Sequence, residues 1–452
     1  MLASILVLIF AGCVVAYWRW RFGIVAALLI GLIQDPIRKM VPDSPAYLAL
    51  SSLPVWLAVV GAAAGSGEVS ISRFLELFPR LTIWLRRFFA YLLLPILLSA
   101  TNGPQTWQIA LMGTFLYALT FFLILAGRVC PCRQFTLRRI LTIYAILTSI
   151  ILVGGPLDRL GWGSRFAAIS TEAMGHIWVT YRTGAAVYML AGFFRGPDVM
   201  GWHASLVFMI SVILASRTWG WLRYLWITVS VWGALNMWLC GRRKMLSMIP
   251  IFLGCYLLLI YKFQNARRVV PVAGLFLMIL GLGWYGIGLL NPDSATEAFY
   301  FTAIHEAGSQ WMQHSVDSVR ITLQQAGFWG YGLGMAQQGI HHIQGDRPEI
   351  WQESGPGKLI VELGIPGTLL FLVMGWTFFQ TSLCALRRKA EDPSFYLYAG
   401  LLSILIANGA AAMISAQIYG DPFIASLVAL MTGLLLSSAP SRLPQEDAPC
   451  PS

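Results

Sequence analysis

Long apolar runs recur along almost the whole of this 452-residue chain, among them "LVFMISVILA", "LFLMILGLGWYGIGLL" and "LLFLVMGWTFF". A helix needs about 20 mainly apolar residues to cross the roughly 30 Å of hydrocarbon in a membrane. Only 11% of the residues are charged, whereas a soluble domain carries about a quarter. The sequence therefore predicts an integral membrane protein.

We expect an all-α fold, a polytopic transmembrane helix bundle of about 12–13 spans in which residues 1–452 form one membrane domain. No long soluble domain, linker or short-period repeat interrupts the pattern. Met1 to Tyr17 lacks a basic region before its apolar run and lacks a small-residue cleavage site, so we expect a retained first helix. The expected spans are 1–17, 22–34, 46–65, 82–100, 105–127, 139–154, 202–216, 220–240, 246–261, 269–290, 357–379, 395–415 and 422–438.

The cysteines give little reason to expect a metal. Their number, seven, is odd, and most lie in or beside spans. Cys130 and Cys132 flank a proline, but no second Cys/His pair lies nearby, so two helix-end cysteines are the simpler interpretation. We expect no bound metal and no cofactor.

The basic residues orient the chain. When alternate loops are placed on opposite sides, the positive-inside rule puts the N-terminus outside and most of the 31 basic residues inside. Twelve fall outside: Arg38, Lys39, Arg159, Arg165, Arg182, Arg195, Arg242, Arg243, Lys244, Arg320, Arg347 and Lys358.

The turn "CGRRKM" is the clearest exception to the rule, because moving Arg242, Arg243 and Lys244 inside would break the alternation on both sides. Outside cations of this kind need either an ordinary topological explanation or an anionic partner. Clustered guanidinium groups bind diphosphates through paired hydrogen bonds. Polyprenyl-diphosphate-linked glycans are such polyanions at the outer face of a bacterial inner membrane.

Two outer segments, 155–201 and 291–356, are far longer than the usual connections, and loops of that length tend to be functional. In the first, an apolar piece near 185–194 is too short to span and suggests a re-entrant or interfacial segment. His203 stands at the entrance of the next helix. It is either a substrate-binding residue or a capping or interfacial histidine.

The second long segment contains a predicted amphipathic helix near 305–327. Met312, Val316, Val319 and Leu323 recur at helical spacing and form an apolar stripe. Arg320 lies beside this stripe, either as the partner of Asp317 in a surface pair or as a ligand for a phosphate or sugar acid.

Chemistry-bearing residues follow that helix. The turn "GYGLG" contains Gly330, Gly332 and Gly334, but no Lys-Ser/Thr pair follows, so it is not a nucleotide-binding P-loop. The ionisable candidates near the next span are His341, His342, Glu353, Lys358 and Glu362. Adjacent histidines are a weak metal signal without a partner at helical spacing.

The order of "CGRRKMLSM", "SVDSVRITLQQAGFWGYGLG", the histidine-containing loop and "VELGIPGTLLFL" resembles the O-antigen ligase and O-antigen polymerase superfamily of membrane glycosyltransferases. Members of that family show an Arg before a Gly-x-Gly-x-Gly turn, then a periplasmic His-Asn-x-Tyr-Leu that leads into Glu-x-Gly-(Ile/Leu)-x-Gly-Leu-Leu. The similarity covers roughly residues 200–373.

The resemblance implies roles for residues. Arg242 or Arg243 would bind the lipid diphosphate, with Lys244, Arg320, Lys358 and His203 as further substrate-binding candidates. Gly330, Gly332 and Gly334 would shape the loop, and Glu362, Gly364 and Gly367 would begin the helix that closes the site.

One departure from the family matters. Counting back from Glu362, the catalytic histidine of the family falls on Glu353. Either Glu353 serves as the general base, or His341 or His342 does, or the chain uses another acceptor or none.

The expected function is transfer of a polyprenyl-diphosphate-linked glycan to a glycan or lipid acceptor at the outer face of a bacterial inner membrane, as a polymerase or ligase that needs no metal. The expected partners are these substrates, membrane lipids and polysaccharide-assembly proteins, with no nucleic acid. Two alternatives stay open: a transporter or flippase for the same lipids, which predicts charged mid-span residues and broken helices, and a non-catalytic assembly scaffold.

Overall fold

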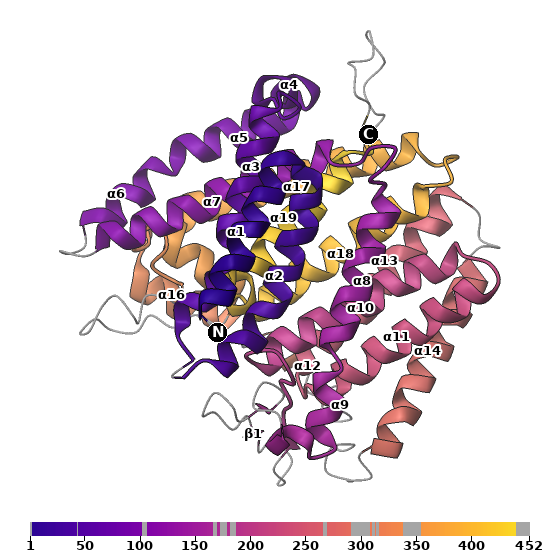
Figure 1. Ribbon diagram of the computed structural model, residues 1–452. Helices are drawn as coiled ribbons and strands as arrows, with labels where there is room; N and C mark the ends of the chain where they lie inside the picture. Colours follow the sequence, from indigo (N-terminus) through magenta and orange to yellow (C-terminus); the bar gives the residue numbers. More distant parts are fainter. Residues whose placement is uncertain are drawn as a thin grey trace. The chain divides into compact units, whose positions relative to one another are not determined.

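The computed structural model describes residues 2–42, 44–101, 106–165, 170–171, 179–180, 187–264, 269–290, 308–309, 312, 316–337 and 354–439. These ranges are almost entirely helical (Figure 1). The strands among them form one antiparallel ladder of two residues each, in which β1 (Val179–Thr180) pairs with β2 (Val187–Tyr188). The all-α prediction is confirmed.

Within the described residues, nine helices are long and apolar enough to cross a membrane, and three shorter apolar helices accompany them. Every span expected from the sequence overlaps one of the helices given below. The protein is therefore a multi-pass membrane protein.

The chain forms two compact units, each assembled from three separate stretches. Unit 1 comprises Met1–Ala63, Pro131–Glu306 and Glu391–Asn408, and unit 2 comprises Ala64–Cys130, Ala307–Ala390 and Gly409–Ser452. The predicted large outer segment 291–356 falls partly in each unit and mostly outside the described residues.

Unit 1 contains most of the helices, two of which (α3 and α18) run past its boundaries. Its elements besides β1 and β2 are α1 (Leu2–Trp18), α2 (Trp20–Met40), η1 (Ala46–Leu50), α3 (Leu53–Gly65), α8 (Leu137–Ile151), α9 (Gly154–Arg159), η2 (Trp162–Arg165), α10 (Pro197–Ser216), α11 (Trp221–Leu239), α12 (Arg243–Leu246), α13 (Met248–Phe263), α14 (Val269–Leu290) and α18 (Phe395–Ile414).

Helix α10 forms the core of unit 1. It is apolar on all sides, and all of its residues except Asp198 and Ser216 are buried, as expected for a helix without a polar face. It runs beside α11 (Figure 1). Two of its polar side chains are hydrogen-bonded inside the unit: Trp202 Nε1 donates to Asn408 Oδ1 at 2.8 Å, and Ser205 Oγ donates to the carbonyl oxygen of Met245 at 3.1 Å. The rigid α10 therefore fixes the positions of the residues at its first turn.

Unit 2 consists of α4 (Ile71–Leu77), α5 (Pro79–Tyr91), α6 (Leu93–Thr101), α7 (Thr106–Val129), α16 (Ser318–Ala326), α17 (Gly355–Arg388), η7 (Gln417–Gly420) and α19 (Pro422–Leu436). Helices α7 and α19 pack side by side through glycine. A Cβ atom at Gly433 would lie 2.2 Å from the carbonyl oxygen of Ile124, and one at Gly127 would lie 2.6 Å from that of Leu430. Such close backbone approach through small residues is typical of membrane helix pairs.

Candidate functional site

The last two turns of α2 hold polar side chains inside unit 1. Gln34, Asp35 and Lys39 are at most 5% exposed. Buried ionisable residues at a membrane boundary are costly and therefore suggest a functional site. From the sequence, Lys39 was predicted only to be an outside cation, and Gln34 and Asp35 were not recognised as candidate site residues. The run "LIQDPIRKM", in which polar residues enter the end of an apolar span, is the signal that could have revealed them.

Lys39 binds two backbone carbonyl groups far away in the sequence. Its Nζ donates to the oxygen of Gly192 at 2.5 Å and to that of Ser170 at 3.2 Å. Gly192 has a positive φ of 54°, and a Cβ atom there would meet the backbone of Gly155 at 2.6 Å. Lys39 thus attaches the connection before α10 to the end of α2.

That connection lies inside unit 1. Residues 187–196 contain β2 and a turn, with Ala191 fully buried and Phe194 2% exposed. The N–H of Ala191 donates to Thr171 Oγ1 at 2.9 Å, and the N–H of Thr171 donates to Asp158 Oδ2 at 2.9 Å. The apolar piece predicted near 185–194 is therefore non-helical in its described part, 187–194, and is mostly buried there, with Tyr188 exposed.

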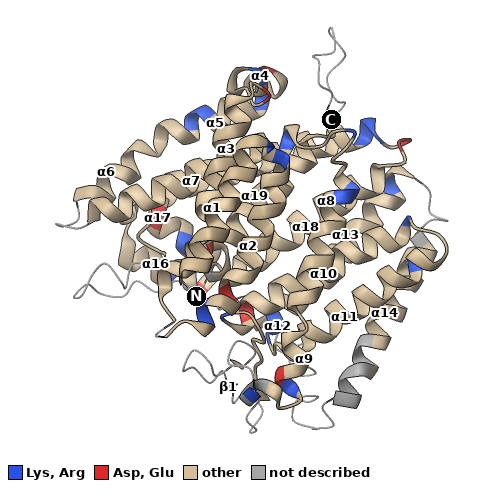
Figure 2. Ribbon diagram, viewed as in Figure 1, with Lys and Arg blue, Asp and Glu red and all other residues tan. Residues whose placement is uncertain are grey.

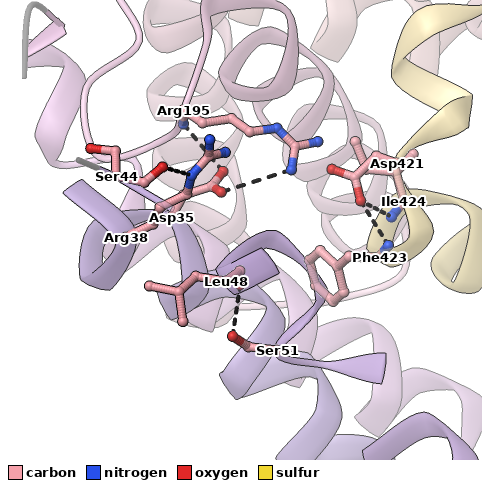
Figure 3. Close-up of polar contacts among 9 residues, drawn as sticks. All are labelled: Asp35, Arg38, Ser44, Leu48, Ser51, Arg195, Asp421, Phe423 and Ile424. Carbon is pink, nitrogen blue, oxygen red and sulfur yellow. Dashed lines mark hydrogen bonds and ion pairs between the residues drawn. The ribbon is translucent and has the colours of Figure 1, made fainter. Parts of the chain in front are cut away.

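Asp35 joins α2 to the residues just before α10 (Figure 3). The N–H of Arg195 donates to Asp35 Oδ2 at 3.2 Å, and the guanidinium of Arg195 lies 3.9 Å from Asp35 Oδ1. Arg38, one turn after Asp35, donates through Nε to the carbonyl oxygen of Ser44 at 2.8 Å. The carboxylate of Asp35 also acts electrostatically on Arg38.

A second carboxylate, Asp198 in the first turn of α10, pairs with the "CGRRKM" turn. Arg242 lies 3.0 Å from Asp198 Oδ2 and Lys244 lies 2.9 Å from Asp198 Oδ1. The side chains of all three residues are 22–24% exposed. Arg243, the first residue of α12, is also half-buried.

We call Arg38, Lys39, Arg195, Arg242, Arg243 and Lys244 the cation cluster. Among the described residues, the carboxylates that contact members of this cluster or act on them electrostatically are those of Asp35, Asp158 and Asp198, so positive charges outnumber negative ones there. Figure 2 shows the acidic and basic positions around α9 and α12. Half-buried cations in surroundings of low dielectric attract anions strongly. The cluster can therefore bind a polyanion.

All six members of the cluster belong to the outside set of the sequence analysis. Ion pairs and hydrogen bonds join the end of α2, the start of α10 and the α11–α12 turn within unit 1. These are three of the connections that the alternation of spans places on one side. The contacts therefore agree with the predicted placement of these three connections on a common side of the membrane.

His203 lies deeper in α10 than the cluster does. It is 1% exposed, its Nδ1 lies 2.7 Å from the hydroxyl of Tyr144, and its ring stacks on Phe194 with centroids 5.0 Å apart. This is the environment of a packed core histidine. Substrate binding by His203 stays a prediction, and it would require Phe194 to move.

Cys240 precedes the "GRRK" turn and is fully buried. Its Sγ donates to the carbonyl oxygen of Met237 at 2.9 Å, so the thiol is packed as a core side chain.

Unit 2 contains the glycine turn of the sequence analysis. Gly330, Gly332 and Gly334 have φ values of 74°, 106° and 82°, which favour glycine. The N–H groups of Tyr331 and Gly332 donate to the carbonyl oxygen of Val361 at 2.7 and 3.3 Å. The turn is thus bonded to the beginning of α17.

The glycine turn also enters the space between α6 and α7. The N–H of Leu333 donates to the carbonyl oxygen of Pro95 at 3.0 Å, and a Cβ atom on Gly334 would lie 2.6 Å from that of Ile109. These partners lie within about two helical turns of the ends of α6 and α7 that the topology places outside. The buried turn 330–336 therefore inserts into unit 2, and we call it the re-entrant turn; helix α16 (Ser318–Ala326) before it is exposed or half-buried over most of its length, as expected for the predicted surface helix.

Helix α16 is the described part of the predicted amphipathic helix. Ser318 at its start lies 2.6 Å, oxygen to oxygen, from Ser354, which caps α17. Of the predicted stripe, Val319 and Leu323 are half-buried, whereas Val316 is 49% exposed. Arg320 is exposed and is free to meet a ligand from solvent.

Helix α17 is broken at Gly364, whose φ of 66° and ψ of −177° are not helical. The N–H of Ile365 donates to the carbonyl oxygen of Phe328 at 2.9 Å, and the hydroxyl of Tyr91 donates to that of Leu363 at 2.7 Å. The backbone groups released by the break therefore find partners inside unit 2. Gly367 lies against Tyr91, since a Cβ atom there would be 2.4 Å from its ring.

Glu362 stands beside this break and is 1% exposed. Its Oε2 accepts a hydrogen bond from the hydroxyl of Tyr117 at 3.1 Å. The Ala336 backbone acts on the same carboxylate, yet among the described residues Oε1 has no well-formed hydrogen bond. The buried carboxylate thus faces the re-entrant turn.

The beginning of α17 carries the remaining candidates. Ser354, Lys358 and Glu362 recur at four-residue intervals, which places them along one face of the helix. Lys358 is half-buried and acts electrostatically on Glu362. Glu353, His341 and His342 lie outside the described residues, so their predicted catalytic roles remain predictions.

The structure therefore assembles the predicted candidates into two groups. Arg242, Arg243 and Lys244 lie in one turn of unit 1, and the glycine turn packs through Gly330 against the part of α17 around Gly364 in unit 2. In the parts of the chain that are described, no three His, Cys, Asp or Glu side chains come together as a metal site. Comparison with protein-family models and with curated proteins finds no match to this chain.

Replacing Lys39 by Met should destabilise the protein. The carbonyl groups of Gly192 and Ser170 would lose their donor, and Asp35 would lose a neighbouring positive charge. We expect the free energy of unfolding to fall by about 1–3 kcal/mol. Thermal unfolding of the purified protein in detergent measures this. Lys262→Met, at an exposed position of the same unit, is the control and should change stability by less than about 0.5 kcal/mol. Equal losses in the two variants would contradict the role of Lys39.

Replacing Gly332 by Ala should disrupt the re-entrant turn. The new Cβ atom would lie 2.4 Å from the N atom of Ser99, and φ is 106°. Gly327→Ala is the matched control, because Gly327 also has a positive φ (66°) but has open space around it. Both variants carry the conformational cost of about 1 kcal/mol, and only Gly332→Ala adds the clash. A lower unfolding temperature for Gly327→Ala than for Gly332→Ala would refute the close packing.

Proposed function

We propose that this protein is a membrane glycosyltransferase that moves a polyprenyl-diphosphate-linked glycan to an acceptor at the outer face of a bacterial inner membrane. The observation that carries the proposal is the cation cluster of unit 1, in which, among the described residues, six cations face three carboxylates at the side that the topology places outside. The order of motifs shared with the O-antigen ligase and polymerase superfamily supports it.

A diphosphate is the ligand whose chemistry fits the cluster best. Its oxygen atoms accept several charge-assisted hydrogen bonds at once, and guanidinium groups donate them in pairs. The cluster members are half-buried or buried, so each interaction with an anion is stronger than in water. The lipid tail of such a ligand would stay in the membrane while the diphosphate binds at its boundary.

The same cations would assist the reaction. When the acceptor hydroxyl attacks the anomeric carbon, the bond from that carbon to the phosphate oxygen breaks, and its electrons leave with the diphosphate. Arg242, Arg243 and Lys244 would stabilise the charge that develops on this leaving group. A carboxylate or imidazole would accept the hydroxyl proton, and Glu353, His341 and His342 are the candidates.

Unit 2 contains a rigid element close in sequence to the candidate base Glu353. The re-entrant turn is held by backbone hydrogen bonds to Val361 and Pro95, and irregular backbone at membrane depth is tolerated only where it is buried in protein or lines a cavity. The turn therefore fixes α17 at Val361, eight residues after Glu353 in the sequence.

A second candidate function has an observation of its own. Transporters commonly place a buried charge at a broken helix, and Glu362 lies two residues from the non-helical Gly364. This arrangement favours a flippase for the same lipid-linked glycans more than the sequence did. The fate of the glycan distinguishes the two functions, because a flippase changes its side of the membrane and a transferase changes its covalent partner.

The test compares surface and lipid-linked polysaccharide in cells. We expect the double variant Arg242→Ala, Arg243→Ala to make at least about 100-fold less transferred product than wild type, because two charge-assisted contacts to the leaving group disappear. Accumulated single-repeat lipid-linked units would indicate a polymerase, and finished but unattached chains would indicate a ligase. Glu353→Ala and the double variant His341→Ala, His342→Ala identify the base.

The matched control is the double variant Arg138→Ala, Arg139→Ala. These two adjacent arginines are exposed at the start of α8, on the side that the topology places inside, and their loss should leave the glycans unchanged. If lipid-linked glycan accumulates on the inner side in the Arg242 and Arg243 variant, the flippase is correct. An unchanged glycan profile in every variant leaves only the scaffold.

A further inference from the structure

Asp198 holds the two ends of the "RRK" turn with separate oxygen atoms. Oδ2 meets Arg242 at 3.0 Å and Oδ1 meets Lys244 at 2.9 Å. A phosphate group would use two of its oxygens in the same manner. The three side chains remain 22–24% exposed, so an incoming anion can reach the pair.

The carboxylate is fixed at its backbone. Asp198 is the second residue of α10, whose N–H groups favour a negative charge at this end. The helix behind it is buried almost throughout. Asp198 can therefore leave its partners only by rotating its own side chain, and it stays close to the turn when it does.

We propose that Asp198 is an internal substitute for a phosphate of the donor lipid and that the donor displaces it from Arg242 and Lys244. The inference rests on the proposed function, because it assigns the diphosphate to the same turn. Asp198 keeps the cations paired and in place while no donor is bound. It also competes for them after transfer, and so promotes release of the polyprenyl diphosphate product.

A purely structural role for Asp198 predicts the opposite effect on binding. If the carboxylate only positions Arg242 and Lys244, its removal disorders the turn and weakens the affinity for diphosphate. If it competes, its removal strengthens that affinity. The sign of the change therefore separates the two roles.

The experiment titrates undecaprenyl diphosphate into the purified full-length protein in nanodiscs of phosphatidylethanolamine and phosphatidylglycerol. We expect Asp198→Asn to bind this lipid about tenfold more tightly than wild type, which corresponds to about 1.4 kcal/mol. Turnover should fall at the same time, because product release slows. Asp198→Ser is the second variant, since serine is well tolerated at helix starts, and thermal unfolding verifies that each variant is folded.

Asp35→Asn is the matched control. It also removes one carboxylate of unit 1, but this carboxylate pairs with Arg195 and not with the "RRK" turn. It should tighten binding much less than Asp198→Asn does. Equal tightening in both variants would mean that only the total charge matters. The proposal that Asp198 takes the place of a phosphate would then be wrong.

The remaining outcomes are distinguishable. If wild type does not bind undecaprenyl diphosphate, the donor assignment of the proposed function fails. If wild type binds it and the folded Asp198 variants bind equally or more weakly, the proposed function stands and the competitive role of Asp198 is overturned.

Discussion

Unit 1 depends on the balance of charge between the end of α2, the start of α10 and the α11–α12 turn. Cations buried at a membrane boundary are stable only with partners, and Asp35 and Asp198 supply them for Arg195, Arg242 and Lys244. Among the described residues, the carboxylates that act on the cation cluster are fewer than its cations, which is why we propose that an anion binds there.

Unit 2 follows a different constraint, the need of every backbone group at membrane depth for a hydrogen bond. The glycine turn and the break at Gly364 supply each other with hydrogen-bond partners. The N–H of Tyr331 donates to the carbonyl oxygen of Val361, and the N–H of Ile365 donates to that of Phe328. Side chains at either place would collide with backbone atoms. Irregular backbone and a buried carboxylate, Glu362, thus occur together in this unit, as they do where membrane proteins bind ligands.

The sequence predicted the helical class and the apolar spans well, because length and hydropathy determine them. It assigned Gly330 to a loop and Gly364 to the start of a helix, and it did not predict that the backbone of the two segments would be in contact. It did not predict the partners of the cations. Asp198 is 44 residues from Arg242 in the sequence, and Lys39 contacts Gly192 across 153 residues, and no local pattern encodes such contacts.

The sequence patterns also did not predict how deeply some segments are buried in the protein. The stripe of Val319 and Leu323 correctly predicted an amphipathic helix, but the sequence did not predict that the turn after it is buried by hydrogen bonds from Leu333 to Pro95 and from Tyr331 to Val361. Gln34 and Asp35 were overlooked for a similar reason, because a polar residue near the end of a span is usually exposed. Both errors concern how far a segment lies inside the protein, which hydropathy alone does not determine.

The most direct test of the account is native mass spectrometry of the protein purified with its bound membrane lipids. The account predicts that wild type retains a lipid with the mass of a polyprenyl diphosphate, with or without its glycan, and that the double variant Arg242→Ala, Arg243→Ala does not. Equal retention in both proteins, or no such lipid in either, would contradict the assignment of the cation cluster as the diphosphate site.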